Sequence, residues 1–170
     1  GSSNGSSNGS SNGSSNGSSN GSTNSATSSG GGGCILSSDL VALYNGSEVP
    51  VSQVRPGDFI LAYSDNTVMP EMVTYLTYTY TNVIEYINGN FGVTPTDQPV
   101  YVKNQTYEGW IKNPDIIKMG WYLYDPLNDT WVKVDNVTYK VGLFKVYDIA
   151  TSGPNTFIVN GYLSDWISKY

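Results

Sequence analysis

Cys34, the only cysteine of the chain, directly follows four glycines. A cysteine thiol can attack the carbonyl carbon of the preceding peptide bond through a five-membered ring, which turns the amide into a thioester. Free energy opposes this step, so the site must strain or polarise the bond and protonate the leaving nitrogen. Gly33 suits such a bond, because it has no side chain to hinder attack and tolerates a distorted backbone. The sequence predicts Gly33–Cys34 as a bond that the chain itself cuts; the alternative is that Cys34 is a small buried apolar residue.

The composition changes at the same place. Residues 1–33 contain only Gly, Ser, Asn, Thr and Ala, with Gly-Ser-Ser-Asn repeating in register from Gly1, whereas all 8 Lys and Arg and all 14 Asp and Glu come later. A tract with nothing to bury cannot offset the entropy of ordering, so we expect disorder there. The sequence predicts a low-complexity repeat over residues 1–33 and one compact domain over residues 34–170.

Asparagines of the repeat and of the domain carry the N-x-S/T signal for N-glycosylation. The candidate acceptors are Asn4, Asn8, Asn12, Asn16, Asn20, Asn45, Asn104, Asn128 and Asn136. A glycosylated repeat would form a stiff stalk, and a naked one would be a flexible spacer. Low charge, many hydroxyl groups and these acceptor sites together favour an extracellular or cell-surface location.

Charge and residue types exclude several functions. The net charge is −6, which leaves no basic patch to neutralise phosphates, so we expect no nucleic-acid partner. No apolar run approaches the roughly 20 residues needed to span a bilayer. The chain has no histidine for a Ser or Cys triad, no cluster of metal-ligating residues and no Gly-rich phosphate loop. We therefore expect neither a metal nor a cofactor.

The residue types and their spacing predict that the elements that position Cys34 are β-strands. Val, Ile, Thr and Tyr fill short runs separated by Pro and Gly, and alternation is clearest over Thr74–Ile87. No stretch has sustained helical periodicity. The sequence predicts an all-β domain with strands over residues 59–64, 74–87, 99–102, 121–125, 131–134 and 156–163, the last containing a tight turn at Asn160–Gly161.

Four segments follow one another in an order and at a spacing that resemble the Hint superfamily, which includes inteins, Hedgehog C-terminal domains and bacterial intein-like domains. The segments are Cys34–Ser64 with its Val-Arg-Pro-Gly-Asp turn, Gly92–Val102 with Thr-x-x-Asp, Gly109–Asp125 with its Trp residues, and Val146–Leu163 with Val-Tyr-Asp-Ile and Asn-Gly. The resemblance covers residues 34 to about 165. It implies a flattened horseshoe of short strands with pseudo-twofold halves, marked by turns at Gly57–Asp58 and Gly120–Trp121.

The resemblance also implies roles for individual residues. Cys34 would be the nucleophile, Thr94 would hydrogen-bond the scissile peptide, and Asp148 would assist activation and transfer. Asp97 stands where the family has a histidine that helps to break the amide. An aspartate could donate that proton only if burial raises its pKa or the surroundings are acidic.

Three explanations for Asp97 remain open. The protein could work in acid or at high temperature, where weaker catalysis is enough, or a histidine could have been replaced to trap the precursor. Alternatively, the domain could be an inactive Hint fold. In the plainer alternative, Thr94–Asp97 is a Thr-Pro-Thr-Asp turn. Asp148 would then be an ordinary polar residue of a paired strand.

The carboxyl-terminal segment limits which Hint chemistry is expected. Splicing inteins end in His-Asn before a Cys, Ser or Thr, whereas this chain has Asp165 and Trp166 there. We therefore expect no splicing, but a single-turnover acyl shift at Gly33–Cys34 with the chain's own repeat segment as substrate. An external nucleophile (water, or an amine or hydroxyl of a glycan, a lipid or a neighbouring chain) would then cleave or accept that segment.

The competing hypothesis is a structural one: an inactive Hint-like domain that acts as a cap or adhesive head of an extracellular repeat fibre. The 14 Tyr and 4 Trp residues would supply its contacts. Cys34 discriminates between the two hypotheses, because a cap has no need of a thiol directly after the glycines.

Overall fold

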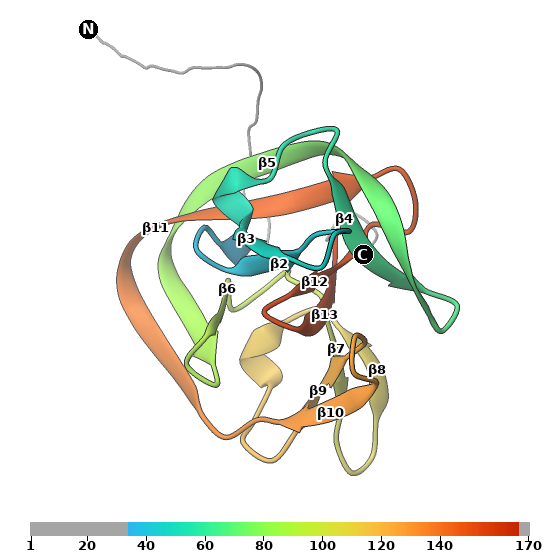
Figure 1. Ribbon diagram of the computed structural model, residues 1–170. Coiled ribbons are helices and arrows are strands. Elements are labelled where there is room, and N and C mark those ends of the chain that lie inside the picture. The colour runs from blue at the N-terminus through green and yellow to red at the C-terminus, as the bar shows by residue number, and fades with distance from the viewer. Residues whose placement is uncertain (1–33, 167–170) are drawn as a thin grey trace, which may run out of the picture.

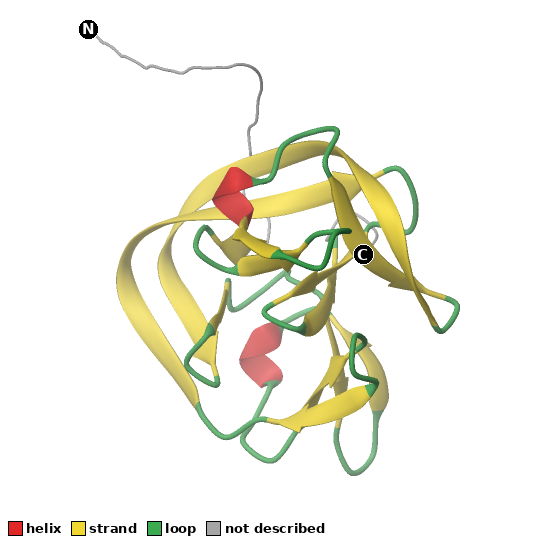
Figure 2. Cartoon of the chain, viewed as in Figure 1, coloured by secondary structure: helices red, strands yellow, loops and turns green. Residues whose placement is uncertain are grey.

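The computed structural model describes residues 34–166, which form an almost entirely β-stranded domain (Figures 1 and 2). The strands in chain order are β1 (Ile35–Leu36), β2 (Leu40–Ala42), β3 (Glu48–Pro50), β4 (Phe59–Ser64), β5 (Thr67–Ile87), β6 (Phe91–Val93), β7 (Val100–Lys103), β8 (Glu108–Ile111), β9 (Tyr122–Asp125), β10 (Thr130–Lys133), β11 (Val137–Thr151), β12 (Thr156–Val159) and β13 (Tyr162–Asp165). Two short 3-10 helices, η2 (Val51–Gln53) and η3 (Pro114–Ile116), interrupt them. None of the helices in this part of the chain is long and apolar enough to cross a bilayer. The all-β prediction is confirmed.

The strands form two sheets that share one apolar core. The first has the order β11-β1-β6-β5-β4, and the second has the order β10-β9-β7-β13-β12-β2-β3, with β8 paired to β7. The largest fully buried side chains are apolar and come from both sheets, among them Ile35, Ile60, Phe91, Leu123 and Phe157. Alternate residues of β4 and β7 are buried, as expected for a period of two, whereas every residue of β6, β12 and β13 is buried.

Strands β5 and β11 pair over most of their length as a long ribbon that curves around one side of the domain (Figure 1). Their register shifts between Val141 and Phe144 and again between Ala150 and Thr151, and such bulges bend and twist a strand pair. Sequence alternation predicted the strand at 74–87 but not its extension to Thr67. The extension comes from a hairpin with β4, in which Asp65 and Asn66 have positive φ values of 52° and 63°.

The two predicted glycine turns have the same hydrogen bonds, which confirms the pseudo-twofold halves. The N–H of Gly57 donates to the Val73 carbonyl at 2.8 Å, and the Val73 N–H donates back to Asp58 at 2.8 Å. In the second half, the N–H of Gly120 donates to Val134 at 2.9 Å, and the Val134 N–H donates back at 2.7 Å to Trp121, which occupies the place of Asp58. Both glycines have a φ of 94°, a conformation that disfavours other residues.

The predicted Asn160–Gly161 turn is confirmed as the two-residue connection between β12 and β13, and it also anchors a buried acid. The Asn160 amide donates to Asp39 Oδ1 at 3.2 Å, and the backbone N–H groups of Leu36 and Gly92 donate to the same carboxyl group. Burial raises the pKa of Asp39 to about 8, although these hydrogen bonds oppose the shift. Sequence reasoning did not single out Asp39.

The glycosylation signals of the domain lie in turns and loops. Asn45, Asn128 and Asn136 are exposed and Asn104 is half-buried. The repeat residues Asn4, Asn8, Asn12, Asn16 and Asn20 lie outside the described residues, as does Gly33. The structure therefore places the domain acceptors where an enzyme could reach them, and their glycosylation stays a prediction.

Glu85 of β5 is a second buried acid, opposite Tyr139 of β11. Neither of its carboxyl oxygens has a hydrogen-bond partner within the described residues. Burial first, and then the charge of Asp115, raise its pKa from 4.5 to about 8, although the nearby Tyr139 hydroxyl opposes the shift. The folded chain therefore favours the protonated acid, and the stabilisation that this gives is complete below pH 4.5 and is lost as the pH rises to about 8.

We expect the free energy of unfolding to fall across this window, with Glu85 contributing up to about 1.4 kcal/mol for each pH unit. Glu85→Gln, which cannot ionise, should show a shallower fall and exceed the natural chain in stability at about pH 8. Urea unfolding from about pH 5 to about pH 8 measures this, with the exposed Glu48→Gln as the matched control. Identical pH dependence of the Glu85 variant and the natural chain would contradict the assignment.

Candidate functional site

Strand β1 carries Cys34 into the interior between two other strands. Ile35 pairs with Tyr147 of β11 on one side and with Val93 of β6 on the other. Continuing both antiparallel registers by one residue places Cys34 opposite Asp148 and Thr94. Three of the predicted site residues, distant in the sequence, therefore lie side by side because of strand register.

Thr94 contacts the peptide nitrogen that the predicted reaction would release. The N–H of Cys34 donates to Thr94 Oγ1 at 2.8 Å, and the N–H of Thr94 donates to the Cys34 carbonyl oxygen at 3.0 Å. The Thr94 hydroxyl in turn donates to the carbonyl oxygen of Thr96 at 3.0 Å. Rotation of the Thr94 hydroxyl would let its O–H donate to the Cys34 nitrogen once that nitrogen has a free lone pair.

Cys34 and Asp148 are both almost completely buried, with exposed fractions of 4% and 3%. Burial first, and then the negative charge of Asp148, raise the pKa of the Cys34 thiol well above its usual range. Asp148 Oδ1 also accepts a hydrogen bond from the N–H of Ile149 at 3.0 Å. The resting thiol is thus protonated, and its activation requires transfer of that proton to a neighbouring base.

Asp97 is placed differently from Thr94 and Asp148. Its carboxylate forms an ion pair with Lys112 at 3.4 Å, and its side chain is 36% exposed. Its backbone has a φ of 64°, and its N–H donates to Asn113 Oδ1 at 3.0 Å. Asp97 therefore has a cationic partner and a side chain in contact with solvent, whereas Cys34 and Asp148 are buried.

The neighbouring Gln98 is a structural residue that sequence reasoning missed. It is fully buried, and its Nε2 donates to Ser164 Oγ at 2.7 Å and to the Asp165 carbonyl oxygen at 3.0 Å. These bonds tie the turn after Thr94 to β13. A glutamine between an aspartate and a proline gives no periodic signal, so only the fold reveals this role.

Residues 34–166 contain no group of three His, Cys, Asp or Glu side chains that could hold a metal ion. The chemistry available at this site is that of one thiol, one hydroxyl and one buried carboxyl group.

No protein-family model matches the chain, and no curated protein sequence is similar to it. Solved structures are similar in fold. A bacterial intein-like domain from Clostridium thermocellum has a TM-score of 0.66 at 19% identity, covering 78% of this chain and 97% of its own. The TvoVMA intein has a TM-score of 0.65 at 18% identity, covering 79% of this chain and 98% of its own. A DnaB intein from Synechocystis sp. has a TM-score of 0.63 at 18% identity, with the same two coverages of 79% and 98%.

These neighbours are similar in fold to this chain over nearly their whole lengths, as the order of the four sequence segments predicted. The resemblance to the Hint superfamily is therefore confirmed at the level of the fold. The described domain has the Hint fold that inteins and bacterial intein-like domains also have.

Proposed function

We propose that this is a self-processing domain that cuts its own chain at Gly33–Cys34 through a thioester. The observation that carries the proposal is the 2.8 Å hydrogen bond from the Cys34 N–H to Thr94 Oγ1. This bond holds the backbone nitrogen of Cys34, which is the leaving group of the proposed reaction. Cys34 also carries the only thiol in the chain. The Hint fold supports the proposal in general terms.

In the first step, Cys34 Sγ forms a bond to the Gly33 carbonyl carbon and the bond from that carbon to the Cys34 nitrogen breaks. The thiol proton must finish on the nitrogen, which becomes a free amine. We assign removal of the proton from sulfur to Asp148, which the β1–β11 register puts opposite Cys34 and which is buried as Cys34 is. The Thr94 hydroxyl holds the nitrogen in place while it changes from a planar amide to a tetrahedral amine.

In the second step, an external nucleophile attacks the thioester carbon and the carbon–sulfur bond breaks. The nucleophile's proton passes to sulfur, so Cys34 ends as a free thiol at a new amino terminus. Water would release the repeat segment, and an amine or hydroxyl of a glycan, lipid or neighbouring chain would accept it. The domain acts once, with its own repeat as substrate.

The glycosylation signals of the repeat support a surface or extracellular setting, in which a repeat released or transferred through Gly33 would form a stalk or fibre. The surface ion pair of Asp97 with Lys112, at the position of the family's histidine, favours a second candidate. In that candidate the domain is inactive and caps the repeat as an adhesive head.

Intact mass of the freshly made chain, followed over time at several pH values and temperatures, tests the proposal. We expect a fragment of residues 34–170, formed faster when hydroxylamine or a thiol is present to attack the thioester. Cys34→Ala should stay whole, because it lacks the nucleophile.

A chain that stays whole under every condition would contradict self-processing by this protein and favour the cap. Asp97→His is the informative companion in that case. Cleavage by this variant but not by the natural chain would show that Cys34, Thr94 and Asp148 can support the reaction. It would also show that the natural chain is inactive because it lacks a proton donor at position 97.

Thr94→Val keeps the shape of the side chain and removes the oxygen that binds the Cys34 N–H. We expect the cleavage rate to fall by roughly tenfold or more, as for the loss of a positioned polar group in a catalytic site. Thr96→Val is the matched control, because the Thr96 side chain is exposed. Equal rates for the two variants would remove Thr94 from the site.

The Cys34 thiol should react slowly with a disulfide reagent at neutral pH, because burial and Asp148 disfavour its thiolate. We expect the folded chain to react more than roughly tenfold slower than the chain unfolded in guanidinium. Asp148→Asn should increase the rate in the folded state, whereas the exposed Asp135→Asn should leave it unchanged. A folded thiol as reactive as the unfolded one would contradict this description.

A further inference from the structure

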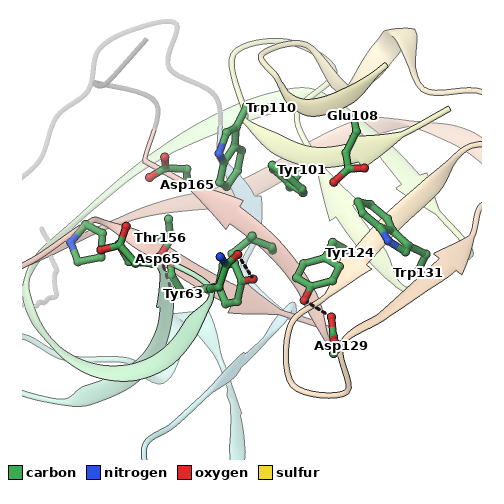
Figure 3. A pocket seen from close by; sticks show the side chains of 14 residues that line it. Tyr63, Asp65, Tyr101, Glu108, Trp110, Tyr124, Asp129, Trp131, Thr156 and Asp165 are labelled. Atoms are coloured by element: carbon green, nitrogen blue, oxygen red, sulfur yellow. Dashed lines mark hydrogen bonds between the residues drawn. The ribbon is translucent and has the colours of Figure 1, made fainter. Parts of the chain in front are cut away.

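A second feature of the domain has no part in the proposed cleavage: a cavity of about 550 Å³ bordered by both sheets (Figure 3). Five aromatic side chains and four carboxyl groups dominate its lining. The aromatic residues are Tyr63, Tyr101, Trp110, Tyr124 and Trp131, and the acidic residues are Asp65, Glu108, Asp129 and Asp165. The volume falls within the range of about 300–1,000 Å³ that is usual for small-molecule sites.

The aromatic rings support one another and turn the cavity into a fixed cup. Tyr101 and Trp131 stack at 6.0 Å with an interplanar angle of 23°, and Tyr124 packs against Trp131 at 5.0 Å. Trp110 and Tyr63 extend the cup on either side through edge contacts at 5.3 Å to Tyr101 and 5.6 Å to Tyr124. In Figure 3 these rings converge on one space. Ring faces carry partial negative charge, so the cup attracts cations.

The charged residues that line the cup are acidic, and one cation, Lys103, lies next to it. Among residues 34–166, no lysine or arginine lines the cavity. Within the described residues, the carboxylates of Asp65, Glu108 and Asp129 make no ion pair. Asp129 instead accepts a hydrogen bond from the Tyr124 hydroxyl at 2.6 Å. Lys103 stands opposite Glu108 in the β7–β8 register, and the excess of acidic groups in the lining complements a cationic ligand.

The same aromatic wall already binds an ammonium group of the protein. Lys103 Nζ lies 4.5 Å from the centroid of the Trp131 ring and 5.8 Å from that of Tyr122. Both distances lie within the roughly 6 Å over which a cation and a ring attract each other. Lys103 is not among the residues that line the cavity, so an ammonium group of the protein lies over the Trp131 ring next to the cavity.

We propose that this cavity is a binding site for an organic ammonium group, quaternary or alkylated, carried by a small molecule or by a side chain of another protein. The rings surround the apolar part of the ammonium, and Asp65, Glu108 and Asp129 neutralise its charge. A neutral saccharide would gain the stacking but leave these carboxylates without a counter-charge. The site is independent of cleavage at Gly33–Cys34, so the two proposals stand or fall separately.

Choline is a suitable probe because it has a neutral isostere, 3,3-dimethylbutan-1-ol, in which carbon replaces the charged nitrogen. Proton NMR of the ligand methyl groups in the presence of the full chain reports binding, since ring currents in an aromatic cup shift these signals upfield. We expect saturable binding of choline and at least roughly tenfold weaker binding of the isostere. Cys34→Ala should bind choline as the natural chain does.

Glu108→Gln and Asp65→Asn should each weaken choline binding about threefold or more, and Trp131→Leu should remove it. Asp135→Asn, an exposed carboxylate outside the cavity, is the control for net charge. Dispersion of the protein NMR spectrum shows that each variant is folded.

Three results would overturn the proposal. The first is no shift of choline at tens of millimolar, and the second is equal binding of choline and its isostere. The third is binding of a neutral disaccharide such as cellobiose that displaces choline and is unaffected by Glu108→Gln and Asp65→Asn. That result would make the cup a saccharide site.

Discussion

Two antiparallel ladders meet on β1, where Ile35 pairs with both Tyr147 and Val93. Because β1 is enclosed on both edges, the residue before it inherits buried neighbours on both sides. The same register that completes the sheet therefore places Thr94 and Asp148 beside Cys34. The site has no separate scaffold: moving any of these strands by one residue would reverse which side chains face the core.

Buried acids accumulate around this central strand. Asp39 accepts the N–H of Leu36, Asp148 lies beside Cys34, and Glu85 pairs with Val93 of β6. Burial raises the pKa of Asp39 and of Glu85 to about 8, so folding favours the protonated form of these two acids. The stability of the domain and the protonation of its thiol therefore both depend on pH.

Much of this structure could be predicted from the sequence, and the failures have physical reasons. Short alternating strands and the Asn160–Gly161 turn are local signals, and the segment order pointed to the Hint fold. The partner of Asp97 is not local, because Lys112 is brought to it by tertiary folding. The aromatic cup is also invisible in sequence, since its rings come from strands that meet only in the folded sheets.

The location of β1 also has a mechanical consequence. The chain that precedes Cys34 is continuous with an interior strand whose hydrogen bonds to β6 and β11 lie across its direction. Tension applied from upstream would load these bonds together in shear, instead of opening them one at a time as in peeling an edge strand. A repeat attached through Gly33 would thus be held firmly under load, and the proposed cleavage after Gly33 would release the tension without unfolding the domain.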